Sequence, residues 1–167
     1  MSISNEFYEK YKAEEIAFAK CIEKYGYTHK KANAYQDIHE HWDLLIEKDG
    51  KELKVDVKAI KKIHRDDPSA NENIHWLELK NVKGENGWAF SEHNDGIVFE
   101  LRSYWFYVDK YKLQEFIKES VNKEKIVQNP YDAFYCIYPR RGKLNEDILT
   151  LVKTIDLLYI KDLMFKK

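Results

Sequence analysis

Cysteine, proline and glycine are scarce in this sequence, and their scarcity limits how the protein can be built. Only two cysteines, Cys21 and Cys136, occur in 167 residues, and both lie among apolar residues. That context predicts buried free thiols in a reducing compartment, not a disulfide or a pair of metal ligands. The three prolines and six glycines form no linker-like stretch, and no repeat or low-complexity segment divides the chain. We therefore expect one domain over residues 1–167.

Net charge and long apolar runs are also scarce. The formal net charge is −1, whereas a protein that coats nucleic acid by bulk charge is strongly basic. Any nucleic-acid-binding surface must therefore be local. No apolar run approaches the roughly 20 residues that a membrane-spanning helix requires, and the opening MSISNEFYEKYKAEE lacks the apolar core of a signal peptide. We expect a cytoplasmic protein without a membrane partner.

Periodic patterns of apolar residues are what the sequence does contain, in a chain that is 44% hydrophobic and 34% charged. Helical spacing predicts a helix over about 5–25, and a second helix is expected over 109–121 with Asp109 as its N-cap. Strand-like runs cover 41–48, 51–60, 75–80, 87–91, 96–101, 131–138 and 148–160, the last ending in a short helix. Residues 104–108 are either a further strand or the lead into the second helix. This order predicts an α/β protein with a mixed sheet flanked by helices.

The strands at 41–48 and 51–60 flank Asp49-Gly50, which strongly predicts a two-residue hairpin turn. Such a turn fixes which residues of the two strands face each other. The expected pairs are Lys48 and Lys51, Ile46 and Leu53, Leu44 and Val55, Asp43 and Asp56, and His41 and Lys58. The register is therefore a prediction that depends on the turn alone.

Alternation of side chains divides this hairpin into two faces. Trp42, Leu44, Ile46, Leu53, Val55 and Val57 share an apolar face, and His41, Asp43, Asp56 and Lys58 share the polar one. Two aspartates that face each other repel unless a cation lies between them, and Mg²⁺ prefers carboxylate oxygens. Lys58 on the same side can orient or deprotonate a water, or offset charge on a phosphate. The alternative is a solvated hairpin face that carries mixed charges.

Asp43 on one strand and the triplet Asp56-Val57-Lys58 on the next, after a helix, resemble the PD-(D/E)XK nuclease superfamily. Trp42 stands where the proline of the motif would precede Asp43. The resemblance covers roughly residues 5–101, and the run over 76–89 resembles small phage-encoded members. It implies a restriction-endonuclease-like fold of the order αβββαβ, Mg²⁺ or Mn²⁺ as cofactor, and a bacterial or phage-infected host cell. It also implies that both aspartates and the Val57 carbonyl bind the metal, while Lys58 positions the attacking water.

Two glutamates are candidates for a further metal ligand. Glu14 falls on the apolar stripe of the first helix, whereas Glu15 lies nearer its edge, and the family's helical glutamate reaches toward the metal. The alternative is that Glu14 reaches solvent or pairs with a lysine such as Lys58. Glu78-Leu79-Lys80 is a second E-x-K triplet. We rank it below the hairpin triplet, because no upstream aspartate is held in register with it, and keep Glu78 as a carboxylate near the metal.

Positive charge is concentrated in two stretches, which would contact phosphates if they flank the polar face of the hairpin. The candidate nucleic-acid-binding residues are His41, Lys61, Lys62, Arg65, Arg140 and Arg141.

Two other patterns are weaker. The run His39, His41, Asp43 would suit zinc or iron, but no third histidine is evident on a neighbouring strand, so we disfavour a transition metal. The aromatic side chains at Trp76, Trp88, Tyr104 and Trp105 are expected in the core rather than as rings that stack on bases.

The hairpin residues together predict a metal-dependent endonuclease that hydrolyses DNA phosphodiester bonds, with a homodimer as a candidate assembly. One alternative is an inactive protein of the same fold that binds nucleic acid or protein. Another is an interaction protein of a phage or mobile element. Convergence of Asp43, Asp56 and Lys58 favours the enzyme, whereas a large exposed apolar patch without a carboxylate cluster favours the interaction protein.

Overall fold

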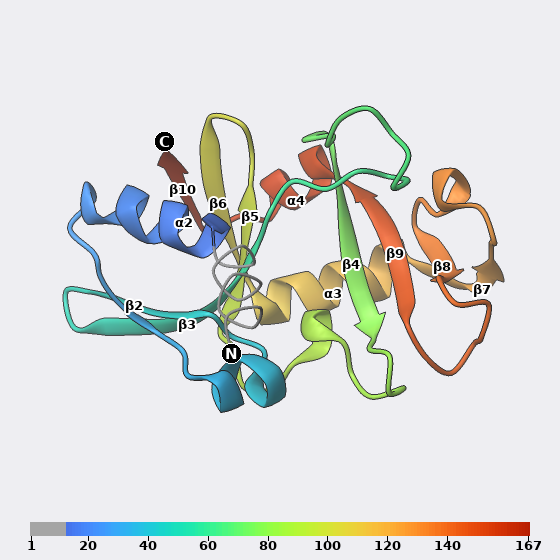
Figure 1. Cartoon of the computed structure of the whole chain (residues 1–167), viewed down its shortest axis with the longest axis horizontal. Coiled ribbons are helices and arrows are strands. Elements are labelled where there is room, and N and C mark those ends of the chain that lie inside the picture. Colours follow the sequence, from blue (N-terminus) through green and yellow to red (C-terminus); the bar gives the residue numbers. More distant parts are fainter. Residues whose placement is uncertain (1–12) are drawn as a thin grey trace, which may run out of the picture.

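The structure, a computed structural model, describes residues 13–167, so residues 5–12 of the first predicted helix lie outside it. The described part of the chain is a mixed α/β protein with two sheets (Figure 1), which confirms the predicted class. Its helical elements are α2 (Ala13–Glu23), the π-helix η1 (Gln36–Glu40), the 3-10 helix η2 (Trp88–Phe90), α3 (Lys110–Ser120), the 3-10 helix η3 (Pro130–Asp132) and α4 (Thr154–Tyr159). Its strands are β1 (Thr28–Lys31), β2 (Leu44–Lys48), β3 (Lys51–Lys58), β4 (Ile74–Lys80), β5 (Gly96–Glu100), β6 (Tyr104–Asp109), β7 (Asn122–Ile126), β8 (Cys136–Pro139), β9 (Ile148–Lys153) and β10 (Leu163–Lys166).

The first sheet has the strand order β1-β2-β3-β5-β6-β10, and the second has the order β4-β9-β8-β7. Within the first sheet β3 and β5 are parallel, and the other neighbours are antiparallel. The connection between β3 and β5, residues 59–95, contains β4 and η2. The described chain begins α2, β1, β2, β3, but β1 was not among the predicted strands. The predicted strand over 75–80 is β4 of the other sheet, and it stands where the order αβββαβ has a helix.

Each face of the first sheet has its own core, because alternate residues of a strand point to opposite faces. Val98 and Trp105 pack with α2 through Phe18 and Ile22. Their neighbours on the other face, such as Phe99, form a cluster with β4, β9 and α3. This second cluster contains side chains from both sheets, and α3 runs behind β4 and β9 in Figure 1.

The hairpin has the predicted register, which is confirmed over its regular part from Lys48–Lys51 to Leu44–Val55. Both turn residues have positive φ, 53° at Asp49 and 78° at Gly50, as a type I′ turn requires. The strand predicted over 41–48 is too long, however, since β2 begins at Leu44.

Two hairpin residues are therefore misplaced by the sequence prediction. His41 is not a strand residue opposite Lys58: it ends η1 in the left-handed region with φ 55°. Trp42 is buried, but none of the core clusters of residues 13–167 includes it. The ammonium group of Lys54 lies over its ring, with Nζ 5.5 Å from the ring centre.

Other elements show what local patterns do and do not encode. Asp109 caps α3 as predicted, because its Oδ1 accepts hydrogen bonds from the N–H groups of Tyr111 and Lys112. The strand expected over 87–91 is instead η2. The prediction of a single mixed sheet is wrong, because β4 belongs to the second sheet and does not lie beside the hairpin. The sequence analysis also missed the polar strand β1, β7 and the terminal β10.

Cys21 and Cys136 are buried free thiols, which confirms that prediction. Among residues 13–167, none of the helices combines the length and the apolar composition needed to cross a bilayer.

Candidate functional site

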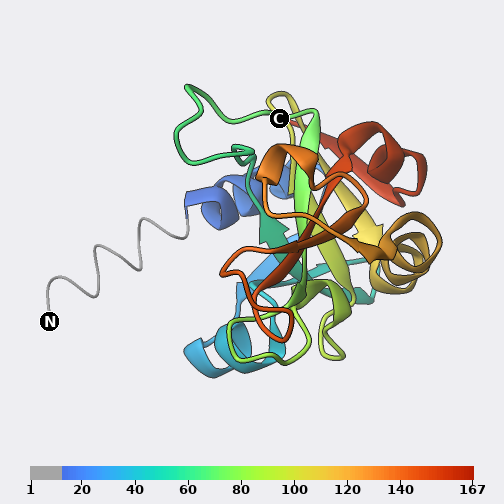
Figure 2. The same cartoon turned by 90° about the vertical axis from the view of Figure 1, so that its right-hand side faces the viewer.

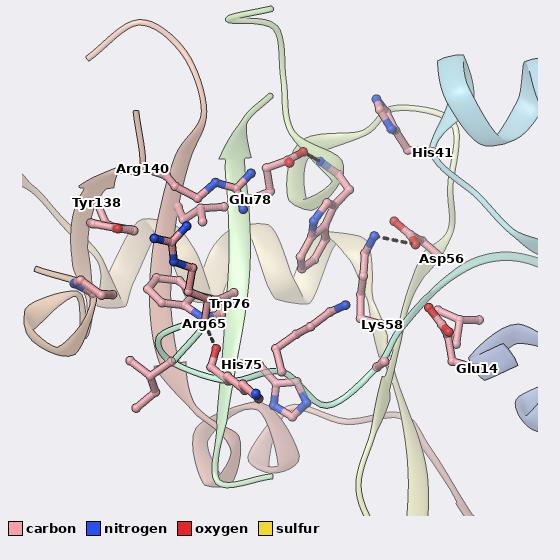
Figure 3. Close-up of a pocket in the computed structure, with 18 of the residues that line it drawn as sticks. Glu14, His41, Asp56, Lys58, Arg65, His75, Trp76, Glu78, Tyr138 and Arg140 are labelled. Atoms are coloured by element: carbon pink, nitrogen blue, oxygen red, sulfur yellow. Dashed lines mark hydrogen bonds and ion pairs between the residues drawn. The ribbon is translucent and has the colours of Figure 1, made fainter. Parts of the chain in front are cut away.

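A cleft of about 1190 Å³ is lined by residues of both sheets. The lining residues come from α2 and β3, from the connection after β3, from the second sheet and from segments next to these. They are Glu14 and Glu15 of α2; Asp43, just before β2; Asp56, Val57 and Lys58 of β3; Ala59, Lys61, Lys62, Ile63, His64 and Arg65 of the connection; His75, Trp76 and Glu78 of β4; Tyr138 of β8 and Arg140 just after it; Leu149 of β9; and Asp37, His41, Trp88 and Pro130. Figure 3 shows Asp56 and Lys58 at one end and Trp76, Tyr138 and Arg140 at the other. All the predicted site residues except Arg141 line this cleft.

Asp43 occupies the edge of β3 that β2 leaves uncovered. Asp56–Lys58 extend beyond the last β2–β3 pair, and the N–H of Asp43 donates to the Val55 carbonyl at 2.8 Å. The Oδ2 atom of Asp43 accepts a hydrogen bond from the Val57 N–H at 2.6 Å. Because the N–H and C=O of one strand residue point to the same side, the Val57 carbonyl also points toward Asp43.

Asp56 and Lys58 form an ion pair in which Nζ lies 2.9 Å from Oδ1. The Asp56 side chain is 5% exposed and that of Lys58 is 28% exposed. The ammonium group of Lys58 also lies 4.7 Å from the centre of the Trp88 ring, which is a cation–π distance. Lys58 is thus held between a carboxylate and an aromatic face.

Trp88 is a site residue that the sequence analysis expected in the core; it lines the cleft instead. Its position depends on Gly87, where a Cβ atom would lie 2.4 Å from the Glu78 carbonyl oxygen. Only glycine permits η2 to come this close to β4. The Trp88 N–H then donates to Glu78 Oε1 at 3.3 Å, and the ring extends to Lys58. The signal in the sequence that could have identified this position is the glycine directly before the tryptophan.

The carboxyl groups of Asp43 and Asp56 interact directly with each other, and both are buried. Burial raises the pKa of Asp43 to about 8, with the neighbouring Asp56 carboxylate as the next cause. Burial also raises the pKa of Asp56, although Lys58 opposes the increase. Burial lowers the pKa of Lys58, but Asp56 and Asp43 outweigh it and hold that pKa above its ordinary value. At neutral pH the lysine is therefore charged, and the two carboxyls retain a proton between them.

This donor set suits a hard divalent cation. A buried pair of carboxyls that needs a proton to limit its repulsion offers the same place to a metal ion. Mg²⁺ commonly uses one or two carboxylates and completes its shell with water and substrate oxygens. Asp43, Asp56 and the Val57 carbonyl would supply the protein oxygens. Residues 13–167 contain no cluster of three or more histidine, cysteine or acidic side chains arranged for a metal, so the rest of the shell would be water and phosphate.

The two helical glutamates are reversed relative to the sequence prediction. Glu15, and not Glu14, is the buried one, on the same side of α2 as Phe18, Ala19 and Ile22. Phe18, Cys21 and Ile22 are buried as the predicted stripe requires, but within residues 13–23 the buried side of the helix includes Glu15 in place of Glu14. Glu14 is half-buried, and both glutamates line the cleft.

Glu78 lies on the second sheet, where its Oε1 accepts the Trp88 N–H. It acts electrostatically on Lys58 and His41, and raises the pKa of each. Glu78 therefore lines the cleft from the second sheet, as a carboxylate that influences the lysine.

His41 lines the cleft even though it is outside the strand. The Asn94 side-chain amide donates to its carbonyl at 3.1 Å, and Ser91 Oγ donates to the carbonyl of Glu40 at 3.0 Å. These contacts hold the left-handed turn in place. Burial lowers the pKa of His41, so its imidazole is neutral at pH 7. The His39 ring lies 4.6 Å from that of Tyr35, centre to centre, and does not line the cleft. The run His39, His41, Asp43, which we disfavoured as a zinc or iron site, therefore lacks its first ligand in the cleft.

The loop over 59–73 carries Lys61, Lys62 and Arg65 along the cleft. Figure 2 shows this blue-green loop projecting from the sheets. The Trp76 indole N–H donates to the Lys62 carbonyl at 3.0 Å, and the Tyr131 hydroxyl donates to Asp67. The loop is thus attached to β4 of the second sheet and to η3.

Arg140 and Arg141 differ in position. Arg140 makes two hydrogen bonds to Asp147, from Nε at 2.9 Å and from Nη2 at 2.8 Å. Arg141 Nε lies 3.2 Å from the same carboxylate but is not part of the cleft lining. The Asp147 side chain is 1% exposed, so it fixes both guanidinium groups at their inner ends.

Comparison with known proteins found no matching family model, no similar curated protein and no similar solved structure.

Proposed function

We propose that this chain is a metal-dependent nuclease that hydrolyses DNA phosphodiester bonds. The observation that carries the proposal is the buried Asp43–Asp56 pair, with the Lys58 ammonium group 2.9 Å from Asp56, in a cleft lined by further basic residues. Two buried carboxylates beside one lysine cost stability in a protein that makes no use of them. Their position in a large cleft is typical of a catalytic site.

A divalent cation held there would polarise the scissile phosphate and lower the pKa of a bound water. Asp43 and Asp56 would bind it, and the Val57 carbonyl would add a third oxygen. Lys58 is charged, so it donates hydrogen bonds and does not accept the proton of the water. It would orient that water and stabilise the charge that grows on the phosphoryl oxygens. His41, Lys61 and Lys62 would hold the neighbouring phosphates.

We infer a restriction-endonuclease-like core from the order of elements. The helix α2, the antiparallel strands β1, β2 and β3, and the parallel neighbour β5 support this inference. In it, the connection over 59–95 contributes β4 to a second sheet in place of the expected helix. One domain over residues 1–167 and a homodimeric assembly remain predictions from the sequence.

The test is cleavage of single-stranded, duplex and branched DNA with Mg²⁺ or Mn²⁺. We expect Asp56→Ala and Asp56→Asn to abolish cleavage, and Lys58→Ala to reduce it by about 100-fold or more, as when one electrostatic donor is removed from a site. Glu52→Gln is the matched control, because Glu52 lies on the same strand and face but is exposed and outside the cleft.

Circular dichroism would show that each variant is folded. Cleavage that survives both Asp56→Ala and Lys58→Ala would refute the proposal. Binding of DNA without any metal-dependent cleavage would favour the inactive binding protein instead.

A further inference from the structure

The wall of the cleft opposite the carboxyl pair contains two aromatic rings from different strands. Trp76 of β4 and Tyr138 of β8 lie with ring centres 5.5 Å apart and an interplanar angle of 34°. Both side chains are half-buried and line the cleft. They flank β9, whose Leu149 pairs with Tyr138 on one side and with Glu78 on the other. The rings therefore form a continuous apolar platform on the second sheet.

Two arginines accompany this platform. Arg140 is 53% exposed, and its inner edge is fixed by the buried carboxylate of Asp147. Arg65 is 89% exposed, and its nearest acidic partner, Asp66, is 3.8 Å away. Figure 3 shows both arginines at the same end of the cleft as Trp76 and Tyr138. Guanidinium groups bind phosphate oxygens through paired N–H donors.

The platform is fixed in position before any ligand binds. The Trp76 indole N–H holds the Lys62 carbonyl, and Trp76 and Tyr138 pack on a small core of Ile74, Ala133 and Leu151. The loop that carries Arg65 is held by the Tyr131–Asp67 hydrogen bond and by the His64 and Tyr131 rings, 6.3 Å apart. Little ordering would be needed on binding.

We propose that this wall is a nucleotide-binding subsite for single-stranded nucleic acid. An unpaired base stacks on the Trp76–Tyr138 platform, and the adjoining phosphate lies between Arg65 and Arg140. In a duplex, each base is stacked between its neighbours and its face is closed to protein, so an aromatic platform selects unpaired nucleotides. The inference rests on the proposed function and adds the substrate class: a single strand, or a single-stranded end or flap, whose backbone continues to Asp43 and Asp56.

The test measures binding apart from cleavage. Fluorescence anisotropy in EDTA would give the affinity for a short labelled DNA single strand, an RNA strand of the same sequence, and the DNA duplex. We expect wild type to bind the DNA single strand more tightly than the duplex. Tyr138→Leu and Trp76→Leu should each weaken single-strand binding by about 5- to 150-fold, the usual effect of losing one stacking ring. Duplex affinity should not change.

Tyr159→Leu is the control for loss of an aromatic ring, because Tyr159 is 92% exposed on α4 and outside the cleft. Arg65→Ala removes an exposed cation without disturbing the core. It should reduce the slope of log affinity against log salt concentration for the single strand by about 1. It keeps the test decisive if Trp76→Leu does not fold. Tighter binding of RNA than of DNA would keep the subsite and reassign the natural strand to RNA.

Failure of this inference differs from failure of the proposed function. The subsite would be overturned if wild type bound duplex and single strand equally well. It would also be overturned if Tyr138→Leu and Arg65→Ala bound the single strand like wild type, even if Asp56-dependent cleavage is present. Single-strand binding that depends on Tyr138, without any cleavage, would retain the subsite and overturn the nuclease.

Discussion

Replacing Asp43 by asparagine should stabilise the metal-free protein while removing its response to metal. Asp43 is 8% exposed and contacts a second buried carboxyl. Burial raises its pKa from 3.8 to about 8, and at 1.36 kcal/mol per pH unit this corresponds to about 6 kcal/mol at most. Asparagine keeps the shape and has no charge to bury. We expect the free energy of unfolding in EDTA at pH 8 to rise by about 2 to 6 kcal/mol.

The pH dependence gives this prediction its sign. The folded state binds the Asp43 proton more tightly than the unfolded state does, so this carboxyl destabilises the fold progressively as the pH rises from about 4 to about 8. The stability difference between Asp43→Asn and wild type should therefore be near zero at pH 4 and largest at pH 8. Urea denaturation followed by tryptophan fluorescence, at several pH values in EDTA, measures this difference.

Metal should reduce the difference in stability between Asp43→Asn and wild type. If the site binds Mg²⁺ with a dissociation constant one tenth of the concentration supplied, wild type gains about 1.4 kcal/mol by mass action, and Asp43→Asn gains little. The Asp43→Asn advantage should shrink accordingly. An advantage that does not vary with pH, or an asparagine variant less stable than wild type at pH 8, would refute the reasoning. Glu52→Gln again provides the control, because that exposed carboxyl lies on the same strand.

Two further predictions concern neighbouring residues. His75 is 3% exposed, and burial lowers its pKa to about 4. The neutral form is therefore favoured in the folded protein, and the free energy of unfolding should fall by about 3 kcal/mol as the pH drops from about 6.5 to 4. Urea denaturation of His75→Gln should not show this loss, and an equal loss in that variant would contradict the assignment to His75. Trp88→Leu removes the ring 4.7 Å from Lys58, so kcat should fall by about 2- to 30-fold with little change in KM. Trp88→Phe should recover much of the rate, and a rate unaffected by either substitution would show that the ring does not position the lysine.

The hairpin was predictable because its information is local. Asp49-Gly50 specifies the turn, the turn specifies the register, and the register decides which side chains share a face. The Asp109 cap is local in the same sense. The end of β2 was not predictable in this way: His41 is held in a left-handed turn by Asn94, which is distant in the sequence.

The second sheet shows why the remainder of the fold could not be predicted from the sequence. The periodicity of residues 75–80 identifies β4 as a strand, but it cannot say that β9 and not the hairpin lies beside it. That choice follows from the packing of Leu77 and Leu79 with α3 residues far along the chain. The same long-range packing brings Arg140 into the cleft and leaves Arg141 outside it, although the two arginines are adjacent in the sequence.

The connection after β3 explains how a chain with a net charge of −1 can offer phosphate a favourable path. Lys58 ends β3, and the basic loop begins directly after it, so the register that places Asp56 also places Lys61 and Lys62. The loop then meets the second sheet at Trp76. Lys58 and Arg140 are paired with Asp56 and Asp147, whereas Lys61 and Lys62 add positive charge to the cleft between them. Under the proposed function, a substrate that reaches from the arginines to the carboxyl pair would be attracted along the loop, and a bound cation would offset the carboxylate charge at its end.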